Sequence, residues 1–210
     1  MKKSKKILLT FASLSLGLPI SLPLIAASCD KKEKKEEVID FSEFESLNKT
    51  YNEKLASLDT KLLSVTNESI KGSIQKFPTF SKETIKTKEQ LIDTMKQLRV
   101  SSQLIDITTK YIDKIIASVD EPVSDDVEVN KAEVTQLTES YNLKVQKIKD
   151  LLISHGQEII IKLLIEPFSK LIEKQPETDA QYGIKVSEMR TYNLMMDMMY
   201  EIFEISLQSL

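Results

Sequence analysis

Cys29 is the only cysteine in the chain, and it directly follows the small residues Ala26, Ala27 and Ser28. A thiol in this position can take up a diacylglyceryl group, after which a signal peptidase that requires small side chains cuts between Ser28 and Cys29. An exported protein with one cysteine forms no internal disulfide, so lipid attachment accounts for the residue. We therefore predict a covalent diacylglyceryl lipid on Cys29, with N-acylation as a further modification, and no other cofactor.

The residues before the cysteine have the layout of a secretory leader. Lysines and no acids occupy the first six positions, and an apolar run then extends from Ile7 to Ala27. A basic start, an apolar middle and small residues at the end are typical of a cleaved signal peptide. The run is about long enough to span a membrane as an uncleaved helix, but Pro19 and Pro23 interrupt it and favour cleavage.

Residues 30–37, which follow the cysteine, are all charged. Such a segment cannot join an apolar core, so we interpret residues 29–41 as a lipidated cysteine and its solvated tether. Contact between the lysines of the tether and anionic lipid headgroups is an alternative role. Because two or three acyl chains anchor a protein stably, we expect the rest of the chain on the extracellular face of the membrane.

His155, the only histidine, has no neighbours that indicate catalysis or metal binding. The chain lacks the H-E-x-x-H spacing of a zinc site and the Gly-x-Ser-x-Gly pattern of a nucleophile elbow. Carboxylate pairs such as Asp125–Asp126 lie in charged segments, where we expect them to be solvated. We predict no enzymatic activity and no catalytic or metal-binding residue, and we expect His155 on a helix face near the end of an apolar stripe.

Five methionines gather near the carboxyl end of the chain: Met189, Met195, Met196, Met198 and Met199. Methionine side chains fill irregular cores, and they are also over-used on promiscuous binding surfaces. Neighbouring members of the Met189–Met199 cluster point to more than one helix face. The pattern favours a core or a self-association surface and leaves a ligand groove as the alternative.

Composition excludes several classes of protein. Loss of the leader removes four lysines and no acids, so the net charge moves from −3 to about −7, whereas nucleic-acid-binding proteins are basic. Only Gly72, Gly156 and Gly183 follow the leader, which is too few for a phosphate-binding loop. The abundance of Lys, Glu, Leu and Ile predicts an all-α fold of long helices with few turns.

The chain carries an internal repeat at an offset of 90 residues, which becomes 91 after one inserted residue. At the first offset the identical pairs include Leu47 and Leu137, Tyr51 and Tyr141, Asn52 and Asn142, Lys54 and Lys144, Leu62 and Leu152, Ser64 and Ser154, Glu68 and Glu158, and Ile70 and Ile160. At the second offset they are Phe77 and Phe168, Thr87 and Thr178, Gln90 and Gln181, Arg99 and Arg190, and Asp106 and Asp197. A repeat of this kind indicates duplication of a supersecondary unit.

Each copy has an apolar stripe with steps of three and four residues, which predicts a long helix close to a coiled-coil pattern. The stripes comprise Phe44, Leu47, Tyr51, Leu55, Leu58 and Leu62, and then Val134, Leu137, Tyr141, Val145, Ile148 and Leu152. A second helix in each copy carries Leu91, Met95, Leu98, Ile105 and Ile112, or Tyr182, Met189, Met196, Met199 and Phe203. Capping boxes or close variants are expected at Ser42–Glu45, Thr87–Gln90, Asn130–Glu133 and Thr178–Gln181.

We predict the following organisation: signal peptide, residues 1–28; lipidated cysteine and tether, 29–41; helical repeat 1, 42–119; linker, 120–129; helical repeat 2, 130–210. The linker is acidic, contains Pro122 and shows no helical stripe. Connections near Phe77–Lys86 and Pro167–Glu177 would join the two helices of each repeat. The predicted fold is all-α, with two repeated long α-hairpins that form either a four-helix bundle or a two-module, coiled-coil-like rod.

The leader, with its Lys-Lys-Ser-Lys-Lys start and its Ile25-Ala-Ala-Ser-Cys29 end, resembles those of mycoplasma surface lipoproteins. The absence of Trp and the Lys- and Ile-rich body fit that class. Within it, the duplicated helical body is similar to the variable adherence-associated antigens of Mycoplasma hominis, modular helical lipoproteins implicated in attachment to host cells. The resemblance implies display toward the host, because such bacteria lack a wall and an outer membrane, and it supplies no binding residue.

We therefore expect a membrane-anchored surface lipoprotein that acts as an adhesin or an antigenic host-interaction protein. An immune-modulating or antibody-binding lipoprotein has the same sequence features. The solute-binding component of a transporter is a further alternative, although such proteins are usually larger, mixed α/β and richer in glycine. The expected partners are the membrane, through the lipid, and host-cell surface or immune proteins, with self-association as an additional contact and no nucleic acid.

Overall fold

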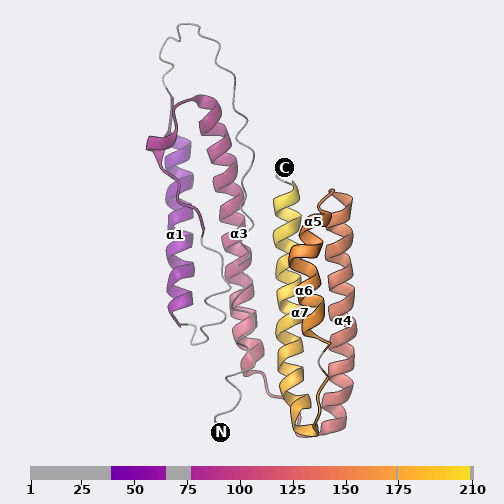
Figure 1. Cartoon of the computed structure of the whole chain (residues 1–210). Coiled ribbons are helices and arrows are strands. Elements are labelled where there is room, and N and C mark those ends of the chain that lie inside the picture. Colours follow the sequence, from indigo (N-terminus) through magenta and orange to yellow (C-terminus); the bar gives the residue numbers. More distant parts are fainter. Residues whose placement is uncertain (1–38, 65–76, 174, 209–210) are drawn as a thin grey trace.

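The computed structural model describes residues 39–64, 77–173 and 175–208, and these residues are all-α, with no strand (Figure 1). The four long helices are α1 (Ser42–Ser64), α3 (Lys88–Asp120), α4 (Val127–Ser154) and α7 (Asp179–Gln208). Between them lie the 3₁₀ turn η2 (Lys82–Thr84), the short α5 (Glu158–Ile160), the π-helical η3 (Ile161–Ile165) and α6 (Glu166–Leu171). The prediction of an all-α fold is confirmed for this part of the chain.

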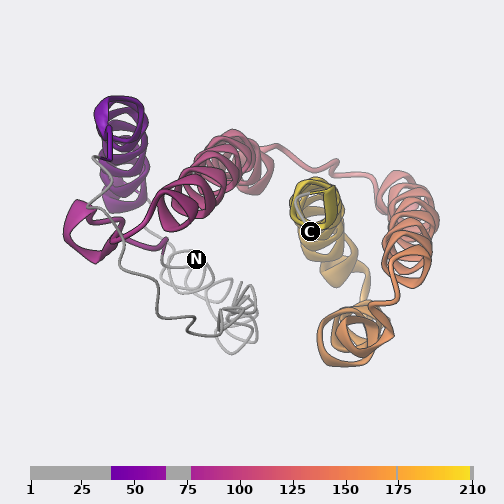
Figure 2. The same cartoon turned by 90° about the horizontal axis from the view of Figure 1, so that it is seen from above.

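The long helices pack side by side in the order α1, α3, α7, α4, so they form an open row (Figure 2). The α5–η3–α6 segment packs beside α4 and α7 on one side of the row. This open row confirms neither the four-helix bundle nor the two-module, coiled-coil-like rod that the sequence suggests. We call α1 with α3 the first unit and α4 with α7 the second unit.

Within each unit the two long helices run in the same direction (Figure 1). Ion pairs join Lys54 to Asp106 and Lys61 to Asp113, so a step of seven residues along α1 matches an equal step along α3. This register requires parallel helices. The expectation of α-hairpins, in which consecutive helices are antiparallel, is therefore wrong.

A parallel pair requires the chain to travel back along the first helix before the second begins. The 28 residues of α4 span about 40 Å, and the chain returns through α5, η3 and α6. Gly156, with a φ of 67°, allows the reversal directly after α4. The sequence reading extended the first helix of this repeat toward Pro167 and missed the break. The matching stretch of the first repeat, including Glu68 and Ile70, lies outside the described residues.

The predicted apolar stripes form the cores of the two units. In the first unit the buried residues are Phe44, Tyr51, Leu58, Ile85, Leu91, Leu98, Ile105 and Ile112. In the second unit they include Tyr141, Val145, Ile148, Leu152, Met189, Met196, Met199 and Phe203, and α5–α6 adds Ile165, Phe168 and Ile172. Tyr182 differs from the prediction, because it is only half-buried and its ring lies under the ammonium of Lys131.

Helix starts agree with the predicted capping boxes at two of the four sites. Thr87 accepts from the backbone N–H of Gln90, and Gln90 Oε1 accepts from Lys86 N at 2.7 Å. Gln181 Oε1 likewise accepts from Glu177 N at 2.6 Å.

The other two starts differ from the boxes that we expected. Helix α4 begins at Val127, not at Asn130, because the Asp126 side chain caps it by accepting from the amides of Glu128 and Val129. At the start of α1, the Asp40 carboxylate accepts from Ser42 N. This backbone hydrogen bond holds the pKa of Asp40 below its ordinary value.

A third apolar cluster joins the two units. It contains Leu104, Ile107 and Tyr111 of α3, packed against α7. On the α7 side the partly buried Leu194, Met198, Ile202 and Ile205 complete the contact. Helices α3 and α7 are antiparallel here (Figure 1).

Candidate functional site

The predicted site residues are distributed over separate parts of the chain. Ser28 and Cys29, the predicted cleavage and lipidation site, lie outside the described residues, as does Glu36–Glu37. Asp126 caps α4, whereas Asp125 is exposed.

His155 is an exposed residue that caps the carboxyl end of α4 and follows closely after Leu152, the last buried residue of the apolar stripe. The expectation of a position near the end of the stripe agrees with this, but His155 lies at the helix terminus and not on a helix face. Its Nδ1 lies 2.9 Å from the carbonyl oxygen of Leu151 and 3.1 Å from Ser154 Oγ. Both contacts are local to the last turn of the helix. His155 therefore closes a helix end, a position that satisfies otherwise unpaired carbonyls.

The methionine cluster belongs to the interior. Met189, Met196 and Met199 are at most 1% exposed, and Met195 packs against the same core. Met198 packs in the cluster between the two units. These methionines are therefore interior packing residues and not an exposed binding surface, because their side chains contact other helices of the same chain.

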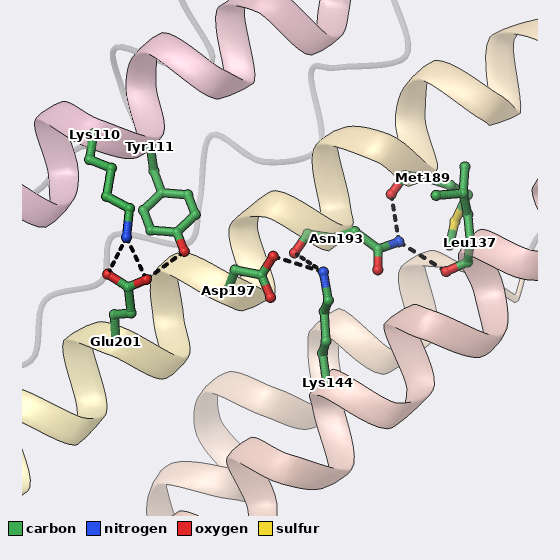
Figure 3. Close-up of polar contacts among 8 residues, drawn as sticks. All are labelled: Lys110, Tyr111, Leu137, Lys144, Met189, Asn193, Asp197 and Glu201. Carbon is green, nitrogen blue, oxygen red and sulfur yellow. Dashed lines mark hydrogen bonds and ion pairs between the residues drawn. The ribbon is translucent and has the colours of Figure 1, made fainter.

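A groove with a volume of about 600 Å³ runs along α7, between α3 and α4. We call it the α7 groove. Its lining comprises Ile107 and Tyr111 of α3, Lys144 and Lys147 of α4, and Met196, Asp197, Tyr200, Glu201, Glu204 and Ile205 of α7. Figure 3 shows the polar contacts along this face, with Lys110 and Tyr111 on one side of α7 and Lys144 on the other.

Glu201 links the two units at one wall of the groove. Lys110 Nζ lies 2.7 Å from Glu201 Oε1, and the Tyr111 hydroxyl donates to the same oxygen at 2.8 Å (Figure 3). Burial disfavours the charged carboxylate, but the hydrogen bonds from Lys110 and Tyr111 outweigh it and hold the pKa of Glu201 below its ordinary value. Burial, together with the adjacent Glu201, raises the pKa of the Tyr111 phenol.

Lys144 links α4 to the floor of the groove. Its ammonium donates to Asp197 Oδ2 at 2.8 Å and to the backbone carbonyl of Asn193 at 3.3 Å (Figure 3). The buried Asn193 amide donates to the carbonyls of Leu137 and Met189, both at 2.9 Å. This network fixes the register of α4 against α7.

Two charged side chains of the groove, those of Lys147 and Glu204, take no part in these networks. Lys147 Nζ lies 4.0 Å from the centre of the Tyr200 ring, a cation–π contact. Glu204 makes no hydrogen bond or ion pair with any other residue of the described part of the chain. The groove therefore offers an aromatic face that accepts a cation and, one helical turn away, a carboxylate without a counter-charge.

The chemistry of this site is that of binding through charge and apolar contact. Among residues 39–64, 77–173 and 175–208, no group of three or more His, Cys, Asp or Glu side chains could hold a metal ion. The same residues contain no helix with the length and apolar character needed to cross a membrane.

Sequence reasoning did not identify the groove. It matched Lys54 with Lys144 and Asp106 with Asp197 as repeated residues, but it did not recognise that each lysine pairs with the aspartate of its own copy. A useful signal was present, because paired charges that recur at both offsets indicate a contact between the two helices that carry them. Tyr200 and Glu204 match no identical residue in the first repeat.

Comparisons of the chain with protein-family models, with curated proteins and with solved structures give no match.

Proposed function

We propose that this chain is a lipid-anchored surface lipoprotein that binds host-cell or immune proteins through a helical body made of two copies of one unit. The observation that carries the proposal is the leader that ends at Ser28 and is followed by Cys29 and a charged tether. Anchoring by two or three acyl chains would hold the body at the outer surface of the membrane.

The position of the first helix is compatible with such an anchor. Helix α1 begins at Ser42, 13 residues after Cys29. Fully extended, a tether of this length reaches at most about 45 Å. Helix α1 begins at the end of the row where α7 ends, whereas the linker between α3 and α4 lies at the opposite end (Figure 1). A tether with this reach allows the helical body to lie outside the membrane surface.

Contacts that recur at the two offsets support the duplicated unit. They are the ion pairs Glu43–Arg99 and Glu133–Arg190, and the ion pairs Lys54–Asp106 and Lys144–Asp197. The hydroxyls of the matched Tyr51 and Tyr141 also each donate to a backbone carbonyl 27 residues later in the chain, that of Pro78 or Phe168. Chance similarity between two helical sequences matches residues, but it does not match the contacts that those residues make. We therefore infer two copies of a unit in which two parallel helices are joined by a returning segment.

The contact between the units also supports duplication. Lys110 and Glu201 are equivalent positions at the offset of 91, and they contact each other directly at 2.7 Å. Equivalent residues face each other across antiparallel helices when a two-fold axis passes between them. The two units thus resemble the subunits of a symmetric dimer that have been joined in one chain.

Display toward a host fits these features. The leader resembles those of mycoplasma lipoproteins, and a protein anchored on a cell without a wall faces host surfaces directly. The strand-free described body differs from the mixed α/β architecture of typical solute-binding lipoproteins. Adhesion and immune modulation require the same exposed helical faces, and we favour adhesion because the resembling antigens are adherence-associated.

The experiment is binding of a soluble fragment, Asp30 to Leu210, to host epithelial cells in competition with whole bacteria. Saturable binding that blocks bacterial attachment is the expected result. A folded, helical fragment that does not bind at micromolar concentration would contradict adhesion. Binding of the same fragment to immobilised antibodies, without binding to cells, would instead identify immune modulation.

A further inference from the structure

We propose that the α7 groove binds a basic side chain, lysine or arginine, that a segment of a partner protein presents to Glu204. The inference deepens the proposed function by naming a ligand chemistry. It rests on the duplicated unit and not on the lipid anchor.

The first unit shows how such a carboxylate is satisfied. On the equivalent face of α1 and α3, Lys61 forms an ion pair with Asp113. At the offsets of 90 and 91, these positions become Leu151 and Glu204 in the second unit. The second copy thus retains the acid and replaces the lysine that neutralises it by an apolar residue. An ammonium or guanidinium group from outside the chain would restore the missing half of the pair.

The other carboxylates of the groove already have cationic partners. Lys144 pairs with Asp197, and Lys110 pairs with Glu201, which also accepts from Tyr111 (Figure 3). Glu204 is therefore the lining carboxylate that remains to attract a positive charge. An acidic ligand would meet three carboxylates, and the two lining lysines are already in contact with other groups, Lys144 with Asp197 and Lys147 with the Tyr200 ring.

The surroundings of Glu204 suit a long basic side chain. Tyr200 lies one turn before Glu204 on α7, and its ring already accepts a cation, the Lys147 ammonium at 4.0 Å. Ile107 and Ile205 line the same groove. Lysine and arginine place their aliphatic stems on apolar surface while their charged ends pair with acids. A volume of about 600 Å³ is sufficient for one such side chain and its neighbours in a peptide.

The two copies also differ at a second pair of matched positions on this face. Ser57 and Thr109 of the first unit correspond to Lys147 and Tyr200 of the second. Short hydroxyl side chains are thus replaced by an aromatic ring and a long amine. The change concentrates aromatic and charged surface in the second copy, where the carboxylate is unpaired.

The test is a titration of the full-length chain in detergent, with ¹³C labels on the methionine methyl groups. The probes are three capped tripeptides with leucine at both ends and arginine, glutamine or glutamate in the centre. Saturable shifts of the Met196 methyl with the arginine peptide are expected. We expect affinity for the glutamine peptide about fivefold weaker, the size of one exposed ion pair, and no binding of the glutamate peptide.

Matched variants assign the effect to Glu204. E204Q should weaken binding of the arginine peptide about fivefold, whereas D113N, the equivalent change in the first unit, should leave it unchanged. L151K places a lysine at the position equivalent to Lys61 and should weaken binding at least as much as E204Q, because the new lysine pairs with Glu204. Equal shifts with the arginine and glutamate peptides, an unchanged affinity in E204Q, or no shift at millimolar peptide would each overturn the proposal.

Failure here is distinguishable from failure of the proposed function. If the protein binds the arginine peptide but does not attach to host cells, that result contradicts the adhesion proposal and leaves the groove proposal intact. Attachment that is unchanged in E204Q, when that variant binds the arginine peptide about fivefold more weakly, would show that the groove is not the adhesive face.

Discussion

The hydroxyl of Tyr141 provides a sharp test of the packing in the second unit. Tyr141 is 0% exposed, and its hydroxyl donates to the carbonyl oxygen of Phe168 at 2.8 Å. The substitution Y141F removes this donor without changing the shape of the ring. The contact between α4 and α6 then loses this buried hydrogen bond, so the packing of α4 against the returning segment should weaken.

The expected loss follows from the burial of that contact. A hydrogen bond contributes a net free energy of about 1 kcal/mol, and its loss costs more where water cannot take the place of the missing donor. We expect Y141F to lower the free energy of unfolding by about 2 kcal/mol. In the first unit, Tyr51 donates to the carbonyl of Pro78 at 2.6 Å, but that contact is only partly buried. Water can replace it, so Y51F should lose about 1 kcal/mol.

The assay is urea unfolding followed by circular dichroism at 222 nm, with the m-value compared between variants to exclude a change in the unfolding reaction. The ordering of the two variants is the critical result. A Y141F protein that loses no more stability than Y51F, or less than about 0.5 kcal/mol, would refute the reasoning from burial.

Three further predictions follow from the same contacts. Burial raises the pKa of Tyr51 from an ordinary value of 10.0 to about 12. The contribution of the Tyr51 hydroxyl to stability is therefore fully present below pH 10 and is lost as the pH rises from 10 to about 12. The measurement is alkaline unfolding, which the substitution Y51F should reduce. E201K places like charges at the contact with Lys110 and should destabilise the protein by about 1–2 kcal/mol, and the K110E/E201K double variant should recover part of the loss in urea unfolding. M196A removes a fully buried side chain and should lower the free energy of unfolding by about 2–5 kcal/mol, and a loss below about 1 kcal/mol would place Met196 outside the core.

The sequence predicted the parts of the fold that depend on local chemistry. The apolar stripes of α1 and α4 identify buried residues such as Tyr51 and Tyr141, because a period of 3.6 residues places them on one helix face. Capping at Thr87 and Gln90 is equally local, since the residues involved lie within one turn.

Helix direction could not be predicted in this way. The same amphipathic stripe can be followed by either of two connections. One is a short loop between antiparallel helices, and the other is a returning segment such as α5–η3–α6. Gly156 was visible in the sequence, but the preceding and following residues continue an apolar pattern, which concealed the break. The paired charges Lys144 and Asp197 held the missing information, because their spacing, compared with that of Lys54 and Asp106, fixes a parallel register.

The groove depends on contacts between helices that are distant in sequence. Ile107 of α3 and Lys147 of α4 line it only because α3 packs against α7 and α7 against α4. The apolar stripe of one helix does not predict which of its other faces will pack against a further helix. Comparison of the two copies would have indicated the position, since Lys61 is replaced by Leu151 opposite a retained acid.

The central claim is that Cys29 carries the lipid that anchors the protein. Its most direct test is mass spectrometry of the protein extracted from membranes of cells that express the full chain. The account predicts loss of residues 1–28 and an N-terminal Cys29 that carries a diacylglyceryl group, with both features abolished in C29S. An unmodified Cys29 thiol in a chain that still retains its first 28 residues would contradict it.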